Sequence, residues 1–177
     1  AQPITISVIA LNFAVGLFYV GSFMVVLPLM VRDTYQSTDA EFTMRFAMIN
    51  IGFWGGTIVA TMVLLKVGHI VRRGRVMMGA LTSGLIILAS LSLTFPFWVL
   101  CVLCFIWGMG AGTTMTMGRT IVQMAAPASH RARVLALYQL GFSGGAPIGS
   151  LVMGFTVGGM GVHSATLVPA GIMVLIL

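Results

Sequence analysis

The sequence predicts an all-α protein whose helices cross a lipid bilayer six times. Hydrophobic residues make up 59% of the chain and charged residues 7%, whereas an ordinary soluble domain has roughly 25% charged residues. The apolar residues fall into blocks of about 20, the length that a helix needs to cross a bilayer. A transmembrane β-barrel is excluded, because its strands alternate polar and apolar residues over roughly 10 positions.

Polar interruptions divide the chain into six expected spans. These are residues 4–31, 46–65, 76–93, 98–118, 134–156 and 163–177. An acidic segment, 32–41, follows the first span, and a basic turn, 66–75, follows the second. Shorter turns at 94–97, 125–133 and 157–161 separate the others. We therefore expect residues 1–177 to form one transmembrane domain.

Charged side chains are segregated between the loops. The acidic segment contains all three carboxylates, and seven of the nine basic residues lie in two other stretches, 66–75 and 119–133. Cytoplasmic loops collect Lys and Arg, so these stretches and both ends of this segment are expected on the cytoplasmic side. This rule explains the net charge of +6. No basic stripe with interleaved aromatic residues predicts nucleic-acid binding.

Glycines recur at four-residue spacing in three of the expected spans. They are Gly52 and Gly56, Gly108 and Gly112, and Gly141, Gly145 and Gly149. Small residues let helix backbones approach closely in lipid, where no hydrophobic effect drives helices together. Packing is one interpretation of these glycines, and bending at Gly and Pro is the other. We expect both roles in the segment 144–149, which contains Pro147.

Three motifs resemble those of the major facilitator superfamily. The turn Gly-His-Ile-Val-Arg-Arg-Gly-Arg is similar to the family loop Gly-x-x-x-Asp-Arg-x-Gly-Arg, with Gly68, Arg72, Gly74 and Arg75 at matching positions. Residues 118–138 resemble the end of helix ten and the start of helix eleven, and residues 141–149 resemble the Gly-Pro-x-x-Gly helix. The resemblance covers the whole chain as helices seven to twelve. It is closest to the branch that contains enterobactin exporters and macrolide efflux pumps.

The resemblance implies a C-terminal half of a twelve-helix transporter, built as two inverted three-helix repeats. The expected function is secondary active export of amphipathic small molecules, drug-like or siderophore-like, by alternating access. Such a protein would be an antiporter for multidrug resistance in a bacterial inner membrane. Its expected partners are the N-terminal six-helix half, which is not present in this chain, or a second copy, together with the lipid bilayer and a small-molecule substrate. Neither a cofactor nor a nucleic acid is expected.

The chain departs from the family pattern at the loop motif. The motif is one residue short, and Val71 stands where the family has an Asp. Arg119 resembles the Arg with which that Asp pairs, so it either meets a partner in the missing half or extends to lipid phosphates. We expect eight residues to serve conformational change. They are the four residues of the loop motif (Gly68, Arg72, Gly74 and Arg75) and, beyond it, Arg119, Gly145, Pro147 and Gly149. No carboxylate lies inside a span, so a proton-coupling acid would belong to the other half.

Seven polar or aromatic side chains inside the spans are candidates for a substrate cavity. They are Asn12, Tyr19, Asn50, Trp54, Trp107, Tyr138 and Gln139. The resemblance places all seven on cavity-lining helices, and it places the third and sixth spans against lipid. Asn50 with Trp54, and Asn12 with Tyr19, are spaced to share a helix face. For each side chain the alternative is an interhelical hydrogen bond or a ring that faces lipid.

Two other classes of function remain open. Cys101 and Cys104 form a Cys-Val-Leu-Cys unit similar to that of quinone-linked thiol–disulfide oxidoreductases. Such an enzyme needs a second redox pair, and this chain has two cysteines, so packing is the favoured role and no enzyme activity is expected. The histidines, His69, His130 and His163, lie in loops on both sides, which argues against a metal site. A non-transporting six-helix scaffold is the third class.

Overall fold

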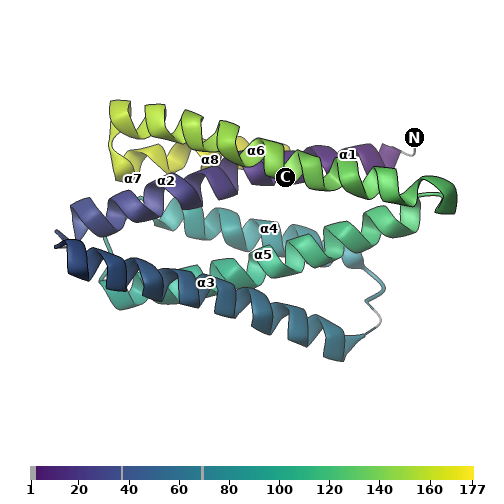
Figure 1. Ribbon diagram of the computed structural model, residues 1–177, viewed down its shortest axis with the longest axis horizontal. Helices are drawn as coiled ribbons and strands as arrows, with labels where there is room; N and C mark the ends of the chain where they lie inside the picture. Colours follow the sequence, from purple (N-terminus) through teal and green to yellow (C-terminus); the bar gives the residue numbers. More distant parts are fainter. Residues whose placement is uncertain (1–2, 37, 69) are drawn as a thin grey trace.

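The computed structural model describes residues 3–36, 38–68 and 70–177, and every regular element within them is helical. The first span consists of α1 (Pro3–Ala14), η1 (Val15–Val20), α2 (Gly21–Leu29) and η2 (Met30–Thr34). The next three are α3 (Asp39–Val67), α4 (Arg73–Ser90) and α5 (Phe97–Ala125). η3 (Ala128–His130) leads into α6 (Arg131–Met160), the fifth span, and α7 (Val162–Ala165) with α8 (Leu167–Ile176) forms the sixth. The expected all-α bundle of six spans is confirmed (Figure 1).

Four of the helices are long and apolar enough to cross a membrane by length and composition. They cover Thr5–Thr34, Asp39–Val67, Phe97–Ala125 and Ala128–Met160. The sixth span, Val162–Ile176, is a shorter apolar helix. α4 has 18 residues and carries Arg73 and Arg75 in its first turn. It nevertheless lies within the bundle, packed against α5 and α8.

Several helices extend beyond the expected spans. α3 begins at Asp39 rather than at residue 46. Its start is fixed by Thr38, whose backbone nitrogen and Oγ1 both donate to Glu41 Oε2 at 3.1 Å. Acidic side chains in a first helical turn are favoured by the positive end of the helix dipole. The expected turn at 157–161 is also mostly helical, because α6 continues to Met160 and ends at Gly161.

The first span changes its helical phase at η1, a π-helical stretch. The i→i+5 bonds of a π-helix widen the turn, so residues on either side lose their α-helical spacing. Asn12 Nδ2 donates to the Tyr138 carbonyl of α6, and Tyr19 Oη donates to the Leu81 carbonyl of α4, each at 2.7 Å. The expectation that Asn12 and Tyr19 share a face is therefore wrong.

The contacts between helices follow an internal two-fold pattern. The first span packs against α6, just as α3 packs against α5, and α4 packs against both α5 and α8. The first span also contacts α5 and α8. Exchanging the first three spans for the last three maps each of these contacts either onto another contact of the set or onto itself. The first repeat has three spans, an odd number, so the second repeat starts at the opposite end of the bundle. The two three-helix repeats are therefore inverted relative to each other.

Glycines line the two equivalent contacts, which we call the first seam (first span with α6) and the second seam (α3 with α5). In the first seam, a Cβ at Gly145 would lie 2.6 Å from Phe13 O, and one at Gly16 would lie 2.5 Å from Phe142 O. In the second seam, a Cβ at Gly112 would lie 2.8 Å from Thr57 O. Real Cβ atoms do not approach other atoms so closely. The packing interpretation of the glycine spacing is confirmed.

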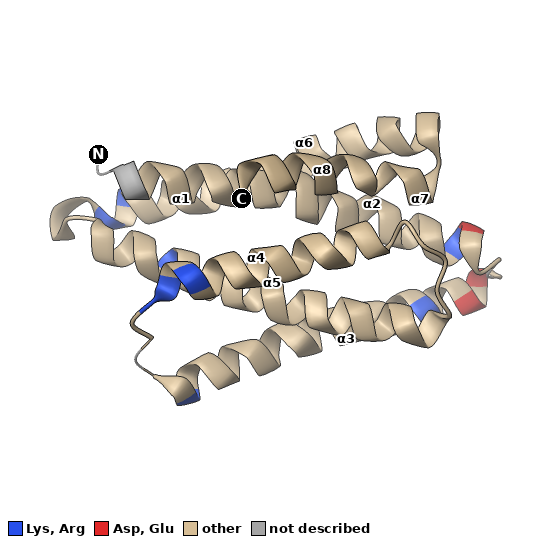
Figure 2. Cartoon of the chain, turned by 180° about the vertical axis from the view of Figure 1, so that it is seen from behind, with Lys and Arg blue, Asp and Glu red and all other residues tan. Residues whose placement is uncertain are grey.

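Acidic residues gather at one end of the bundle and a group of basic residues at the other. Figure 2 shows Lys and Arg clustered where α3 ends and α4 begins, and all Asp and Glu near the opposite end. Arg32 and Arg45 also lie at this acidic end. Side chains tie the helices together at this acidic end. Arg45 Nη1 donates to the Tyr35 carbonyl at 3.1 Å, and Tyr35 Oη donates to the Phe95 carbonyl at 2.6 Å. Burial raises the pKa of Tyr35 above its ordinary value, so the phenol stays protonated as a donor.

Candidate functional site

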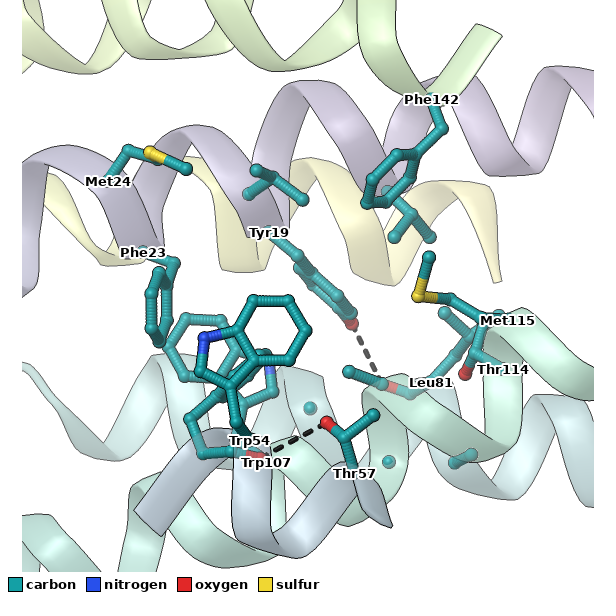
Figure 3. Close-up of a pocket in the computed structure, with 17 residues that line it drawn as sticks. Tyr19, Phe23, Met24, Trp54, Thr57, Leu81, Trp107, Thr114, Met115 and Phe142 are labelled. Atoms are coloured by element: carbon teal, nitrogen blue, oxygen red, sulfur yellow. Dashed lines mark hydrogen bonds between the residues drawn. The ribbon is translucent and has the colours of Figure 1, made fainter. Parts of the chain in front are cut away.

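An apolar cavity of about 190 Å³ lies in the middle of the bundle and takes wall residues from five of the six spans. We call it the aromatic cavity, because six of its wall residues carry rings. These are Tyr19, Phe23, Phe53, Trp54, Trp107 and Phe142. Met24 and Met115 add flexible apolar side chains to the same wall (Figure 3). None of the described wall residues is charged.

Trp107 is the buried centre of the aromatic group, with 3% of its surface exposed. Its ring centroid lies 6.3 Å from that of Tyr19 and 5.8 Å from that of Phe23, with interplanar angles of 80° and 71°. Such edge-to-face pairs are worth about 0.5–1.5 kcal/mol beyond the area that they bury. Gly84 on α4 leaves room for the indole, since a Cβ there would lie 3.4 Å from Trp107 Nε1. The inner wall of the cavity is therefore closely packed.

Trp54 is placed differently from Trp107. It lines the same cavity, yet 58% of its surface is exposed. Its ring stands at 89° to that of Phe53, with the centroids 5.6 Å apart. A large ring with one face free at the rim of an apolar cavity is available to a ligand.

Two polar groups of the wall are engaged within the protein. Tyr19 Oη donates to the Leu81 carbonyl, as Figure 3 shows, and Thr57 Oγ1 donates across the second seam to the Gly108 carbonyl at 3.0 Å. Thr114 is buried against the cavity, and its hydroxyl forms no hydrogen bond with another described residue. The cavity therefore offers a ligand hydrocarbon, ring faces, the Thr114 hydroxyl and the indole N–H groups of Trp54 and Trp107, which form no hydrogen bond with another described residue.

A second cavity, of about 240 Å³, lies between α5 and α6. We call it the polar cavity. Its lining consists of Met115, Thr116, Arg119, Thr120, Gln123, Tyr138 and Gln139. Tyr138 is 5% exposed, and its buried Oη has no hydrogen-bond partner in the described part of the chain. Met115 lines both cavities.

The structure separates the seven cavity candidates into three groups. Tyr19, Trp54 and Trp107 line the aromatic cavity, whereas Tyr138 and Gln139 line the polar cavity. Asn12 and Asn50 line neither. The amide of Asn12 is buried and bonded to the Tyr138 carbonyl, and that of Asn50 donates to the Phe46 carbonyl of its own helix at 2.9 Å. One helical turn thus separates Asn50 from the cavity wall that contains Trp54.

Sequence reasoning missed much of the aromatic wall. Phe23 follows the candidate Tyr19 by four residues and Thr57 follows the candidate Trp54 by three, so helical spacing from these candidates could have found them. The third span was expected to face lipid, but Ala80, Leu81 and Gly84 of α4 form part of the wall. These small and aliphatic residues carry no signal of a binding site in the sequence.

The loop motif lies at the basic end of the bundle. Gly68 ends α3 with φ 68° and ψ −100°, a conformation that is essentially restricted to glycine. Arg72 precedes α4, and Gly74 and Arg75 lie in its first turn. The neighbouring Arg73 joins this turn to the end of α5, with Nη1 2.8 Å from Met124 Sδ. Arg119 instead lines the polar cavity.

The remaining candidate groups have structural contacts. Cys101 is half-buried and Cys104 is fully buried, and both are free thiols. The ring of His163 lies between Thr34 Oγ1 and the Leu91 carbonyl, 3.1 Å from each. His130 lies 2.8 Å from Ser129 Oγ, and His69 lies outside the described residues. Among the described residues no group of three potential ligands could hold a metal ion.

Comparison with known proteins gives one match. The family model described as Major Facilitator Superfamily matches residues 7–177. No curated protein matches the sequence. No solved structure matches it either. The family match covers all six helical spans, including both seams and both cavities.

Proposed function

Because the chain belongs to the major facilitator superfamily, whose members are membrane transporters, we propose that it forms the substrate-binding wall of an exporter of amphipathic small molecules. The aromatic cavity carries this proposal. It is the one described cavity that gathers rings from both three-helix repeats, with Trp54 at its rim. A thiol oxidoreductase is not favoured, because Cys101 and Cys104 lie outside both cavities.

The chemistry of the wall favours ligands with a ring or an apolar body. Burying apolar surface contributes about 25 cal/mol per Å², and ring pairs add to this in edge-to-face geometry. Methionine side chains adapt to different shapes, which suits a site that accepts related molecules. A drug-like or siderophore-like solute would therefore place its apolar part against Trp54 and Phe142.

We further propose that this chain forms helices seven to twelve of a transporter that works by alternating access. In such transporters two halves rock about a site near the middle of the membrane. The glycine seams favour movement of this half as a rigid unit, because backbone meets backbone along them. The opposite wall would come from an N-terminal half or a second copy, packed toward the exposed face of Trp54.

The proposed setting is a bacterial inner membrane, with the basic end of the bundle in the cytoplasm. The helices begin and end differently from the expected spans, so Asp33 lies in η2, the last turn of the first span, and Asp39 and Glu41 lie in the first turn of α3. All three carboxylates are at the acidic end, and none lies beside either cavity. An antiporter that exchanges substrate for protons needs a titratable acid within the membrane. We therefore assign that acid to the other half.

Trp54 and Trp98 provide a matched test, because each is 58% exposed and Trp98 does not line the aromatic cavity. In the complete transporter, reconstituted in proteoliposomes, Trp54→Ala should lower substrate affinity about tenfold, which corresponds to ~1.4 kcal/mol. Trp98→Ala should leave affinity unchanged. Thermal unfolding of both variants checks that the fold is intact. Normal transport by a folded Trp54→Ala protein would contradict the proposal.

A further inference from the structure

The polar cavity continues the aromatic cavity toward the basic end of the bundle. Along α5, the aromatic cavity takes residues as far as Met115, and the polar cavity takes residues from Met115 to Gln123. Along α6, Phe142 belongs to the first cavity and Tyr138, one turn earlier, belongs to the second. Because α5 and α6 run in opposite directions, both helices place the cavities in the same order. The two cavities therefore lie end to end along α5 and α6, apolar and then polar, with Met115 in the lining of both.

Arg119 supplies the only charge among the described residues that line the two cavities. It follows Met115 by one helical turn, or about 6 Å along the helix axis. Its guanidinium forms no hydrogen bond or ion pair with another described residue. The amides of Gln123 and Gln139 also form no hydrogen bond within the described chain. The polar cavity is thus lined by several hydrogen-bond donors that have no partner among the described residues, and no described carboxylate lines it.

Tyr138 adds a second observation that points to a ligand. Its hydroxyl is buried and unpartnered in the described part of the chain, and leaving a buried polar group unsatisfied destabilises the protein. Gly118, next to Arg119, makes room for it, since a Cβ there would lie 2.6 Å from Tyr138 Oη. The cavity volume of about 240 Å³ exceeds the roughly 30 Å³ that one water occupies. It can therefore hold a group of several heavy atoms.

The geometry points to an amphipathic organic anion as the substrate, and this inference rests on the proposed function of the aromatic cavity. The apolar body would occupy the aromatic cavity, and a carboxylate or phosphate group would bind Arg119, Tyr138 and Gln139. The guanidinium fork matches the two oxygens of either group, and hydrogen bonds to an ionised acceptor are about twice as strong as neutral ones. An anionic lipid headgroup has the same oxyanion chemistry, so the test must separate the two sources.

The test compares three ligands that share one ring system and differ in charge. Naphthylacetate, naphthylacetamide and naphthylethylamine carry a negative, no and a positive charge at neutral pH. Their binding to the complete transporter is measured by equilibrium dialysis in phosphatidylcholine nanodiscs, with empty nanodiscs subtracted. The proteins are wild type, Arg119→Gln, Arg119→Lys, Trp54→Ala and the control Arg133→Gln, an exposed arginine outside both cavities. Thermal unfolding confirms that each variant is folded.

The carboxylate should bind wild type about tenfold or more tightly than the amide does. Arg119→Gln should abolish this preference, whereas Arg119→Lys should retain much of it and Arg133→Gln should retain all of it. Equal binding of the three ligands, weakened by Trp54→Ala, would overturn the anion assignment and leave the proposed function intact. A preference that persists in Arg119→Gln would also overturn it.

Two further outcomes separate the remaining possibilities. In nanodiscs that contain phosphatidylglycerol, the preference for carboxylate should persist. Its disappearance there would assign the polar cavity to a lipid headgroup and overturn the substrate assignment. Binding that is absent for all three ligands, or indifferent to Trp54→Ala, would remove the aromatic cavity as the substrate site. The proposed function and the anion assignment would then fail together.

Discussion

Asn12 Nδ2 donates a 2.7 Å hydrogen bond to the backbone carbonyl oxygen of Tyr138, which joins α1 to α6 across the first seam. The amide is 2% exposed, so neither water nor lipid competes for it. A polar side chain inside an apolar bundle is satisfied here by the backbone of a neighbouring helix. Asn12 is therefore placed as an interhelical contact, one turn away from the aromatic wall.

Replacing Asn12 should weaken the bundle more than replacing Asn50. Asn50 donates to a carbonyl of its own helix, so it links no two helices. Interhelical hydrogen bonds in membrane proteins contribute about 0.6 kcal/mol on average and at most ~1.7 kcal/mol. Asn12→Leu should lower the midpoint of thermal unfolding by a few degrees, and Asn50→Leu should change it less. Equal midpoints for the two variants would show that the bond to Tyr138 adds no stability.

Adjacent glycines of α6 should differ sharply in their tolerance of alanine. A Cβ at Gly145 would lie 2.6 Å from Phe13 O, whereas one at Gly144 has no atom within 4 Å. Gly145→Ala should destabilise the protein by about 1–3 kcal/mol, the usual range for overpacking. Gly144→Ala should be neutral or stabilising by up to ~1 kcal/mol, because alanine favours a helix. Denaturation of both purified variants measures the difference, and similar losses would argue against the seam.

The two thiols should react at very different rates in the folded protein. Cys104 is completely buried, whereas Cys101 is partly exposed. A maleimide should therefore label Cys101 and reach Cys104 only after denaturation. The double substitution Cys101→Ser with Cys104→Ser should retain transport, since neither residue lines a cavity. Loss of transport together with quinone-dependent oxidation of the pair would instead support the oxidoreductase alternative.

Single cysteines at the two charged ends should label from opposite sides of the membrane. In a cysteine-free background, Asp39→Cys reports on the acidic end and Arg75→Cys on the basic end, and both positions are exposed. An impermeant maleimide applied to intact cells should label the first and not the second, because basic loops stay in the cytoplasm. Labelling of the Arg75 position in intact cells would reverse the proposed orientation.

The sequence predicted the number and order of the spans, because apolar length and the distribution of Lys and Arg are properties of single segments. It predicted the seams from glycine spacing for the same reason. It placed the start of α3 at residue 46 rather than at Asp39, because hydropathy does not register a helix cap formed by Thr38 and Glu41. The phase change at η1 was also invisible, since a π-helical turn has no residue signature in Val15–Val20.

The candidate site was predictable only in part. Rings inside spans identified Tyr19, Trp54 and Trp107, which line one cavity. The amides of Asn12 and Asn50 carry the same polar signal, yet both are engaged by backbone carbonyls. Whether such a side chain lines a cavity or bonds to a backbone carbonyl depends on the neighbouring helix, and spacing along one helix does not reveal it. Gly118 illustrates the same point, because its role follows from the position of Tyr138 on another helix.

The sequence separation of the seams imposes an order on biogenesis. The second seam joins helices that are separated by a single span, so it can close as soon as α5 has entered the membrane. The first seam must wait for α6, because the Asn12 contact spans 126 residues. Until then the glycine face of the first span lacks α6, the helix against which it packs. The glycine face of the first span is therefore covered later than that of α3.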